Sequence, residues 1–354
     1  MLYSFIPISL GIASILYFFA GILSFFHWIV KKRKNLYLLG LSWTLQGLFW
    51  LLDSIAQFQL NQKLLSNIFI IQVLGILCLV IFIEYTSYER INILRFSIFL
   101  VISVLSIIFP IITDSIEEIP DYGLHVVGVS RLIQLITFSI YSIIYFWWGY
   151  TIWKQSPNNL KKNATIFFIG TINLSLLSAV FYGLGSIFLF FNGIAFISNA
   201  IGVLIILISM IKEPKLMNIL PFKVQSLTVI DANSGIIMFK KNWMKEKSVV
   251  NDKLLSAVIQ GFSDIFDNVI NIGKIKEIHL NKAILLISQK EKYPVLFALI
   301  ATKSSKSLRL NLDNFANKFL KEFKEFLDNP NEVAQFSKAK RLVDEIFYFI
   351  PEYD

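Results

Sequence analysis

The chain has 354 residues, of which 55% are hydrophobic and 16% are charged, and its formal net charge at pH 7 is +9. Soluble globular proteins carry about 25% charged residues, so this composition excludes an ordinary soluble protein. Residues 1 to 211 hold 11 of the 33 Lys and Arg and 7 of the 24 Asp and Glu, which leaves 22 and 17 for the remainder. The two parts therefore have net charges of +4 and +5, and nucleic-acid binding is not needed to explain either value. This division predicts a membrane domain followed by an aqueous one.

Long apolar runs in the first part predict membrane-spanning helices. A helix needs about 20 apolar residues to cross about 30 Å of hydrocarbon. Runs of this kind predict seven spans, at residues 5–29, 36–58, 65–86, 94–113, 124–152, 164–187 and 190–211. The last two form almost continuous apolar sequence and need an internal turn, for which Asn192-Gly193 and Gly183-Leu184-Gly185 are the candidates.

The charges between the spans alternate along the chain. Basic residues collect in every second connection: Lys31 to Lys34, then Arg90 and Arg95, then Lys154, Lys161 and Lys162, and finally Lys212 and Lys215. The connections between these hold only Lys63, a group of four acidic residues, or no charge. Because Lys and Arg accumulate on the cytoplasmic side, the pattern predicts a multi-pass protein of the cell membrane with its N-terminus outside and its C-terminus in the cytosol.

Two ionisable residues fall inside the predicted spans, Asp53 in the second and Arg131 in the fifth. At 1.5 Å per residue, both are expected roughly 8 to 10 Å below the outer surface, so they could meet. One interpretation is a salt bridge that fixes helix packing, because charges within a membrane usually pair. A second is a ligand pocket that opens outward, with Gln57, Gln134 and Tyr182, and also Gln46, as further polar contributors. In a third, the two never touch and Arg131 snorkels to the surface.

The span interiors hold no paired carboxylates, no His-Glu metal set and no Ser-His arrangement. A proton-coupled transporter or an intramembrane protease would ordinarily need such groups. The second part of the chain has no phosphate loop and no Gly-rich kinase loop. The sequence therefore predicts a non-catalytic protein without a cofactor.

The pattern changes after residue 223 to short strands and amphipathic helices. Strands are predicted at residues 224–231, 236–240, 276–280, 283–288 and 294–302, and helices at 252–269, 311–328 and 331–349. The order β-β-α-β-β-β-α-α predicts an antiparallel five-stranded sheet with helices on it, an α+β architecture. The predicted fold is thus a membrane all-α seven-helix bundle (1–211), a linker (212–222) and a small α+β domain (223–354).

This cytosolic part resembles the longin domain, within the wider longin/roadblock group. The residues that carry the resemblance are Leu227-Thr228-Val229-Ile230-Asp231, Ile236-Ile237-Met238-Phe239, the strand triplet 277–280, 284–287 and 295–300, and the helix from Phe315 to Phe326. The resemblance covers residues 223 to 349 and has no catalytic signature. It implies a non-catalytic scaffold that binds a small GTPase or another longin/roadblock protein, with homodimer formation through this domain as a further expectation.

The densest basic stretch in this part contains Lys240, Lys241, Lys245 and Lys247. It is interpreted either as a solvated loop or as a patch that contacts anionic lipid, to which each residue near the surface would contribute about 1 kcal/mol.

Three hypotheses for function follow. The main one is a receptor or sensor-like membrane protein whose longin-like domain recruits a partner in signalling or vesicle trafficking. The second is an inert membrane anchor for a trafficking scaffold. The third is a transporter or lipid-handling protein with a regulatory cytosolic domain.

Overall fold

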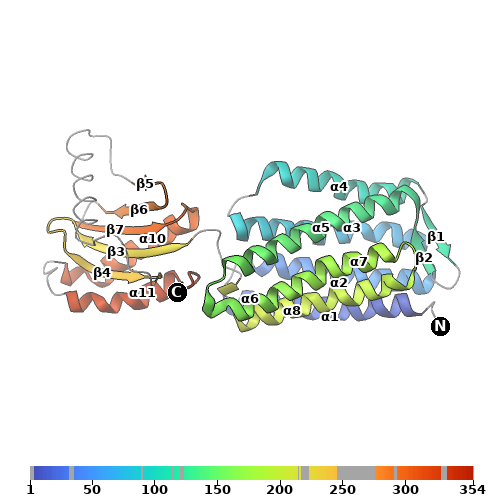
Figure 1. Ribbon diagram of the computed structural model, residues 1–354, viewed down its shortest axis with the longest axis horizontal. Coiled ribbons are helices and arrows are strands. Elements are labelled where there is room, and N and C mark those ends of the chain that lie inside the picture. The colour runs from blue at the N-terminus through green and yellow to red at the C-terminus, as the bar shows by residue number, and fades with distance from the viewer. Residues whose placement is uncertain are drawn as a thin grey trace. The chain divides into compact units, whose positions relative to one another are not determined.

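The computed structural model describes residues 4–31, 36–88, 91–113, 115–119, 123–213, 215–216, 223–244, 276–290, 293–327 and 333–353. The chain forms two compact units, Met1–Met217 and Asn218–Asp354 (Figure 1).

The first unit is a bundle of long apolar helices. Its helices are α1 (Phe5–Lys31), α2 (Leu36–Gln59), α3 (Gln62–Tyr88), α4 (Ile93–Ile112), α5 (Gly128–Gln155), α6 (Asn158–Ile172), α7 (Ser178–Leu184) and α8 (Phe190–Lys212). A π-helical turn, η1 (Asn173–Leu177), joins α6 to α7, so that the two make one span. Within the described part of the chain, seven helices are long and apolar enough to cross a membrane, which confirms the predicted number of spans and supports a multi-pass membrane protein.

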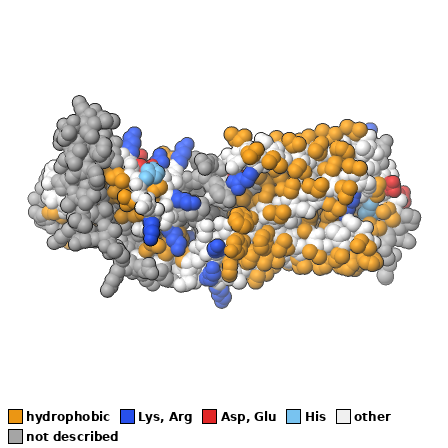
Figure 2. Space-filling model, turned by 45° about the horizontal axis from the view of Figure 1, so that its top comes forward, with side chains coloured by type: hydrophobic (Ala, Val, Ile, Leu, Met, Phe, Trp, Pro, Cys, Tyr) orange, Lys and Arg blue, Asp and Glu red, His pale blue; other side chains and the backbone are white. Residues whose placement is uncertain are grey.

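The surface of this unit is suited to lipid. Hydrophobic side chains cover most of its visible face (Figure 2). Large apolar side chains such as Ile15, Ile22 and Ile143 are more than half exposed. Soluble proteins rarely expose so large an apolar surface to water, so this surface is suited to contact with the lipid bilayer.

The connection between the last two spans lies at Gly185, between α7 and α8, as the Gly183–Gly185 segment predicted. The alternative position at Asn192-Gly193 is wrong, because both residues lie inside α8. Gly193 is instead a packing residue: a Cβ there would lie 2.3 Å from the ring of Phe5, so α1 and α8 approach closely at this point.

A β-hairpin between α4 and α5 was not predicted. Strands β1 (Ile116–Ile119) and β2 (Gly123–Val126) pair antiparallel at the end of the bundle where the N-terminus lies (Figure 1). The fifth span therefore starts at Gly128 and not at residue 124. Gly123 and Gly128 have φ angles of 85° and 62°, which favour glycine, and they allow the chain to enter the second strand and then turn into α5.

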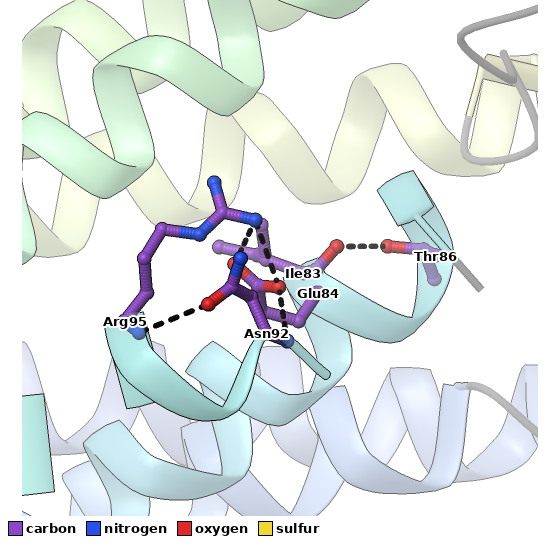
Figure 3. A network of polar contacts seen from close by, with 5 residues as sticks. All are labelled: Ile83, Glu84, Thr86, Asn92 and Arg95. Atoms are coloured by element: carbon purple, nitrogen blue, oxygen red, sulfur yellow. Dashed lines mark hydrogen bonds and ion pairs between the residues drawn. The ribbon is translucent and has the colours of Figure 1, made fainter. Parts of the chain in front are cut away.

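A polar cluster joins the C-terminal end of α3 to the start of α4 (Figure 3). The Glu84 carboxylate lies 3.2 Å from Nη2 of Arg95 and accepts a hydrogen bond of 3.2 Å from the backbone N–H of Asn92. The Asn92 side chain in turn accepts from the backbone N–H of Arg95 and caps α4. Because a cap satisfies a helix N–H that has no partner within the helix, these contacts fix where α4 begins.

The second unit contains a five-stranded antiparallel sheet. Its strands are β3 (Val224–Asp231), β4 (Ile237–Asn242), β5 (Glu277–His279), β6 (Ile284–Gln289) and β7 (Val295–Ala301), in the order β4-β3-β7-β6-β5. The helices are α10 (Lys306–Glu322) and α11 (Ala339–Ile346), with 3₁₀ turns η4 (Lys324–Phe326) and η5 (Val333–Lys338) between them. A small α+β sheet domain is therefore confirmed, and the predicted helix at 252–269 lies outside the described residues.

The helices pack on one face of this sheet through aromatic side chains. Phe319 is fully buried, with its ring 5.5 Å from Phe297 on β7 and 5.8 Å from Phe336 on η5. Helix α10 begins five residues before the predicted start, because the Ser305 side chain caps it by accepting from the backbone N–H of Leu308. The predicted last helix, at 331–349, is in part the 3₁₀ turn η5, and its α-helical part is only α11.

Candidate functional site

The helical unit contains a cavity at the end closed by the β1–β2 hairpin. Its volume is about 100 Å³, somewhat smaller than an engineered cavity of roughly 150 Å³ that binds benzene. Residues from α1, α2, α3, α4, α5, α7, α8 and β2 line it. Strand β2 contributes Leu124, His125 and Val126, so the unpredicted hairpin forms part of the wall.

The five polar residues proposed as a ligand site from the sequence all line this cavity: Asp53, Gln57, Arg131, Gln134 and Tyr182. They come from α2, α5 and α7, which are far apart in the sequence. Gln46, the sixth candidate, does not line it, and its amide donates to the backbone oxygen of Gln72 at 3.1 Å.

Asp53 is only 8% exposed. One of its carboxylate oxygens accepts a single long hydrogen bond, of 3.4 Å, from Nε2 of Gln57. Gln57 is used mainly elsewhere: its side chain donates to the backbone oxygen of Leu124 and accepts from the backbone N–H of Leu124, each at 2.8 Å. The Gln57 amide therefore fastens the hairpin to α2, and it leaves most of the hydrogen-bonding capacity of the Asp53 carboxylate unused.

Arg131 is held by neutral groups. Its Nη1 donates to the hydroxyl of Tyr182 at 2.5 Å, and its Nη2 lies 3.3 Å from the Tyr182 backbone oxygen and 3.4 Å from Oδ1 of Asn192. The guanidinium also lies 4.1 Å from the centre of the Tyr182 ring, a cation–π distance. These contacts orient the charge of Arg131 but do not neutralise it.

No ion pair joins Asp53 to Arg131, since every ion pair between described residues involves other side chains. That both lie at one depth below the membrane surface stays a prediction, and the helix bounds give only their distances from the helix ends. Arg131 is three residues from the start of α5, about 4.5 Å along its axis, whereas Asp53 is six residues from the end of α2, about 9 Å. Arg131 lies nearer to the start of its helix than predicted, because α5 begins four residues later, at Gly128, behind the hairpin.

The cavity has further unpartnered donors and an apolar remainder. Nε2 of Gln134, one helical turn from Arg131, and Nε1 of Trp50 are buried without a hydrogen-bond partner. Aromatic rings complete the wall, and the ring centre of Trp50 lies 4.9 Å from the ring centres of both Phe49 and Phe196. The arrangement suits a small molecule with an apolar body and charged or polar ends.

A polar cluster at Asn199 connects the cavity with η1. Asn199 lines the cavity, accepts a hydrogen bond from the hydroxyl of Tyr17 on α1, and donates to the backbone oxygen of Leu174 at 3.1 Å. The neighbouring Ser198 donates to Oδ1 of Asn173 at 2.7 Å. Because π-helical turns leave irregular backbone hydrogen bonding, side-chain partners from α8 stabilise this one.

Asn192, Asn199 and His125 also line the cavity, and none of them was predicted as a site residue. The two asparagines lie two and nine residues after Phe190, the first residue of α8, and an isolated asparagine in an apolar span is only a weak signal of a site. His125 had no signal, because it was assigned to the edge of a predicted span. Among the described residues, no group of three or more His, Cys, Asp or Glu side chains lies together as metal ligands would.

The basic stretch in the second unit differs from its predicted form. Lys240 and Lys241 lie in β4 and not in a loop, because that strand continues to Asn242. Nζ of Lys241 forms an ion pair of 2.5 Å with Glu352. Lys245 and Lys247 lie outside the described residues, and contact with lipid remains a prediction.

Comparison with family models, with curated proteins and with solved structures found no match for this chain.

Proposed function

We propose that this membrane protein is a receptor or sensor: a small ligand binds in the cavity of the helical unit, and the longin-like second unit acts as a non-catalytic scaffold. The observation that carries the proposal is the meeting of Asp53, Arg131, Gln134 and Tyr182 from three separate helices around one cavity. Polar side chains are costly inside a bilayer, and a group of them facing a common space is therefore best explained by a ligand.

Helix α8 provides a route from the cavity to the rest of the chain. Asn192 and Asn199 of α8 line the cavity, and α8 ends at Lys212, a few residues before the second unit begins in the sequence. A ligand that favours one position of α8 would shift the population of that state and act on the segment that follows.

The alternating basic connections support an orientation with the hairpin end outside and the second unit in the cytosol. In the second unit, five antiparallel strands with α10 and α11 on one face support the longin-like resemblance. Under this proposal the partner is a small GTPase or a longin/roadblock protein, or a second copy of the same domain.

The coupling is tested by hydrogen exchange on the full chain in nanodiscs. The low-molecular-weight fraction of the medium in which the source cells grow is added, and backbone exchange is followed at residues 223–244 and 276–327. The proposal expects protection to change there, and expects the change to be lost in Arg131→Gln. A fraction that slows exchange around the cavity but leaves the second unit unchanged would overturn the receptor mechanism.

A second experiment separates a receptor from an inert anchor. Residues 5–212 are replaced by an unrelated membrane anchor, and recruitment of cytosolic partners is compared with the full chain in the presence and absence of the same fraction. A receptor loses its ligand dependence in this chimera. Identical recruitment by both proteins under both conditions would favour the inert anchor.

A further inference from the structure

The ligand cavity presents two opposite charges that the protein does not pair with each other. Asp53 and Arg131 both line it, on α2 and α5, and no ion pair joins them. The hydrogen-bond partners of both are neutral: Gln57 for Asp53, and Tyr182 and Asn192 for Arg131. Since charges within a membrane bundle normally find a partner of opposite sign, each of these is available for one.

The two charged groups that line the cavity also differ in hydrogen-bonding character. Around Arg131, the remaining N–H groups of the guanidinium and the unpartnered Nε2 of Gln134 are all hydrogen-bond donors. These two residues are three apart on α5 and therefore lie on the same face of the helix. The Asp53 carboxylate, in contrast, is only an acceptor when ionised. The surroundings of Arg131 thus favour an anionic group such as a carboxylate, and those of Asp53 favour an ammonium group.

Apolar and aromatic side chains form much of the remaining cavity wall. Phe49, Trp50, Phe69, Phe138 and Phe196 line the cavity together with aliphatic residues of α1 and α3. Such walls suit a compact apolar body, and aromatic rings near an ammonium group add cation–π attraction. The cavity volume of about 100 Å³ limits the body to a small one.

Resting on the proposed function, we propose that the ligand is a small zwitterion of the α-amino-acid class. Its ammonium group binds the Asp53 carboxylate, its carboxylate binds Arg131 and Gln134, and its apolar side chain packs against the aromatic walls. A zwitterion neutralises both buried charges at once, which neither an amine nor an acid can do alone.

The test measures binding to the full chain in nanodiscs by calorimetry, first with each proteinogenic amino acid. The tightest binder is then compared with its own amine and acid analogues, which for L-leucine are 3-methylbutylamine and 4-methylpentanoate. The intact amino acid is expected to bind at least about 10-fold more tightly than either analogue, because each analogue leaves one buried charge without a partner.

Two variants assign the groups. Asp53→Asn is expected to weaken binding of the amino acid and of the amine by about 10-fold or more, and to leave binding of the acid unchanged. Arg131→Gln is expected to weaken binding of the amino acid and of the acid, and to leave binding of the amine unchanged. The analogue that each variant still binds shows that the variant is folded, and Ser142→Ala, a buried change on α5 away from the cavity, is the matched control.

Equal affinity for all three probes, equal losses for all three in either variant, or no binding of any amino acid would overturn the zwitterion assignment. If the growth-medium fraction changes exchange in the second unit while no amino acid binds, the receptor proposal stands and this assignment is wrong. If an amino acid binds with the expected pattern but exchange in the second unit is unchanged, the assignment stands and the receptor proposal is wrong.

Discussion

The contact between Gln57 and the hairpin gives the sharpest prediction for the helical unit. Replacing Gln57 by Ala removes two hydrogen bonds of 2.8 Å to the backbone of Leu124, a residue that is 1% exposed. Both backbone groups of Leu124 are then buried without these partners. Leaving a buried group unsatisfied costs about 1–3 kcal/mol, so the closed hairpin should be destabilised by about 2–6 kcal/mol relative to an open state in which water reaches Leu124.

This loss is measured as hydrogen exchange at residues 115–119 and 123–127 in the full chain in nanodiscs. Since about 1.4 kcal/mol corresponds to a tenfold change in an equilibrium, exchange in the hairpin should become at least about 30-fold faster. Gln46→Ala is the control, because Gln46 is also a buried glutamine of α2, and its side-chain amide donates to the backbone oxygen of Gln72 and not to the hairpin. Hairpin exchange in Gln57→Ala within about twofold of the wild type would refute the reasoning, because other contacts would then hold the hairpin closed.

Three further predictions concern packing and ionisation. Gly202→Ala should lower stability by about 1–3 kcal/mol in a thermal melt of the full chain, because the added Cβ would lie 2.6 Å from atoms of Leu174 in η1. Gly183→Ala is the control and should be tolerated, because a Cβ at Gly183 would have no neighbouring atom within 4 Å. Phe319→Ala should destabilise the second unit by about 3–5 kcal/mol, seen as faster exchange in β7, whereas the partly exposed Phe326→Ala should have a much smaller effect; equal effects would contradict the assigned core. Burial raises the pKa of Tyr353 from 10.0 to about 12, so the unfolded state loses this proton first and stability should fall as the pH rises above 10. The ultraviolet absorbance difference between the wild type and Tyr353→Phe should therefore show a phenol titrating near pH 12, and a midpoint near pH 10 would show that the ring is not buried.

Several features of this protein followed from local sequence. An apolar run of about 20 residues has few options other than crossing a bilayer, and all seven predicted spans are present. Alternation of side chains between two faces likewise predicted all five strands of the second unit to within about two residues. Polar residues inside spans identified five residues of the cavity wall, because such residues are costly in lipid and therefore face the bundle interior.

Other features depended on contacts between distant segments. The β1–β2 hairpin could not be predicted, because its strands are four residues long and it is fastened by Gln57, which lies 67 residues before Leu124 in the sequence. The π-helical turn in the sixth span depends similarly on Ser198 and Asn199 of α8. Neither partner has a local pattern that reveals it.

The sequence by itself determined the number of membrane crossings, the division into two units and the presence of a charge of each sign inside the bundle. These are consequences of hydrophobic burial and strand or helix periodicity, which act over a few turns of chain. Only the tertiary structure decided that Asp53 and Arg131 share a cavity without pairing, because the start of α5 and the bonds of Tyr182 and Asn192 fix where the guanidinium lies. The three-dimensional placement of the Asp53 and Arg131 side chains, which their positions along the spans did not reveal, therefore leaves both charges available to a ligand.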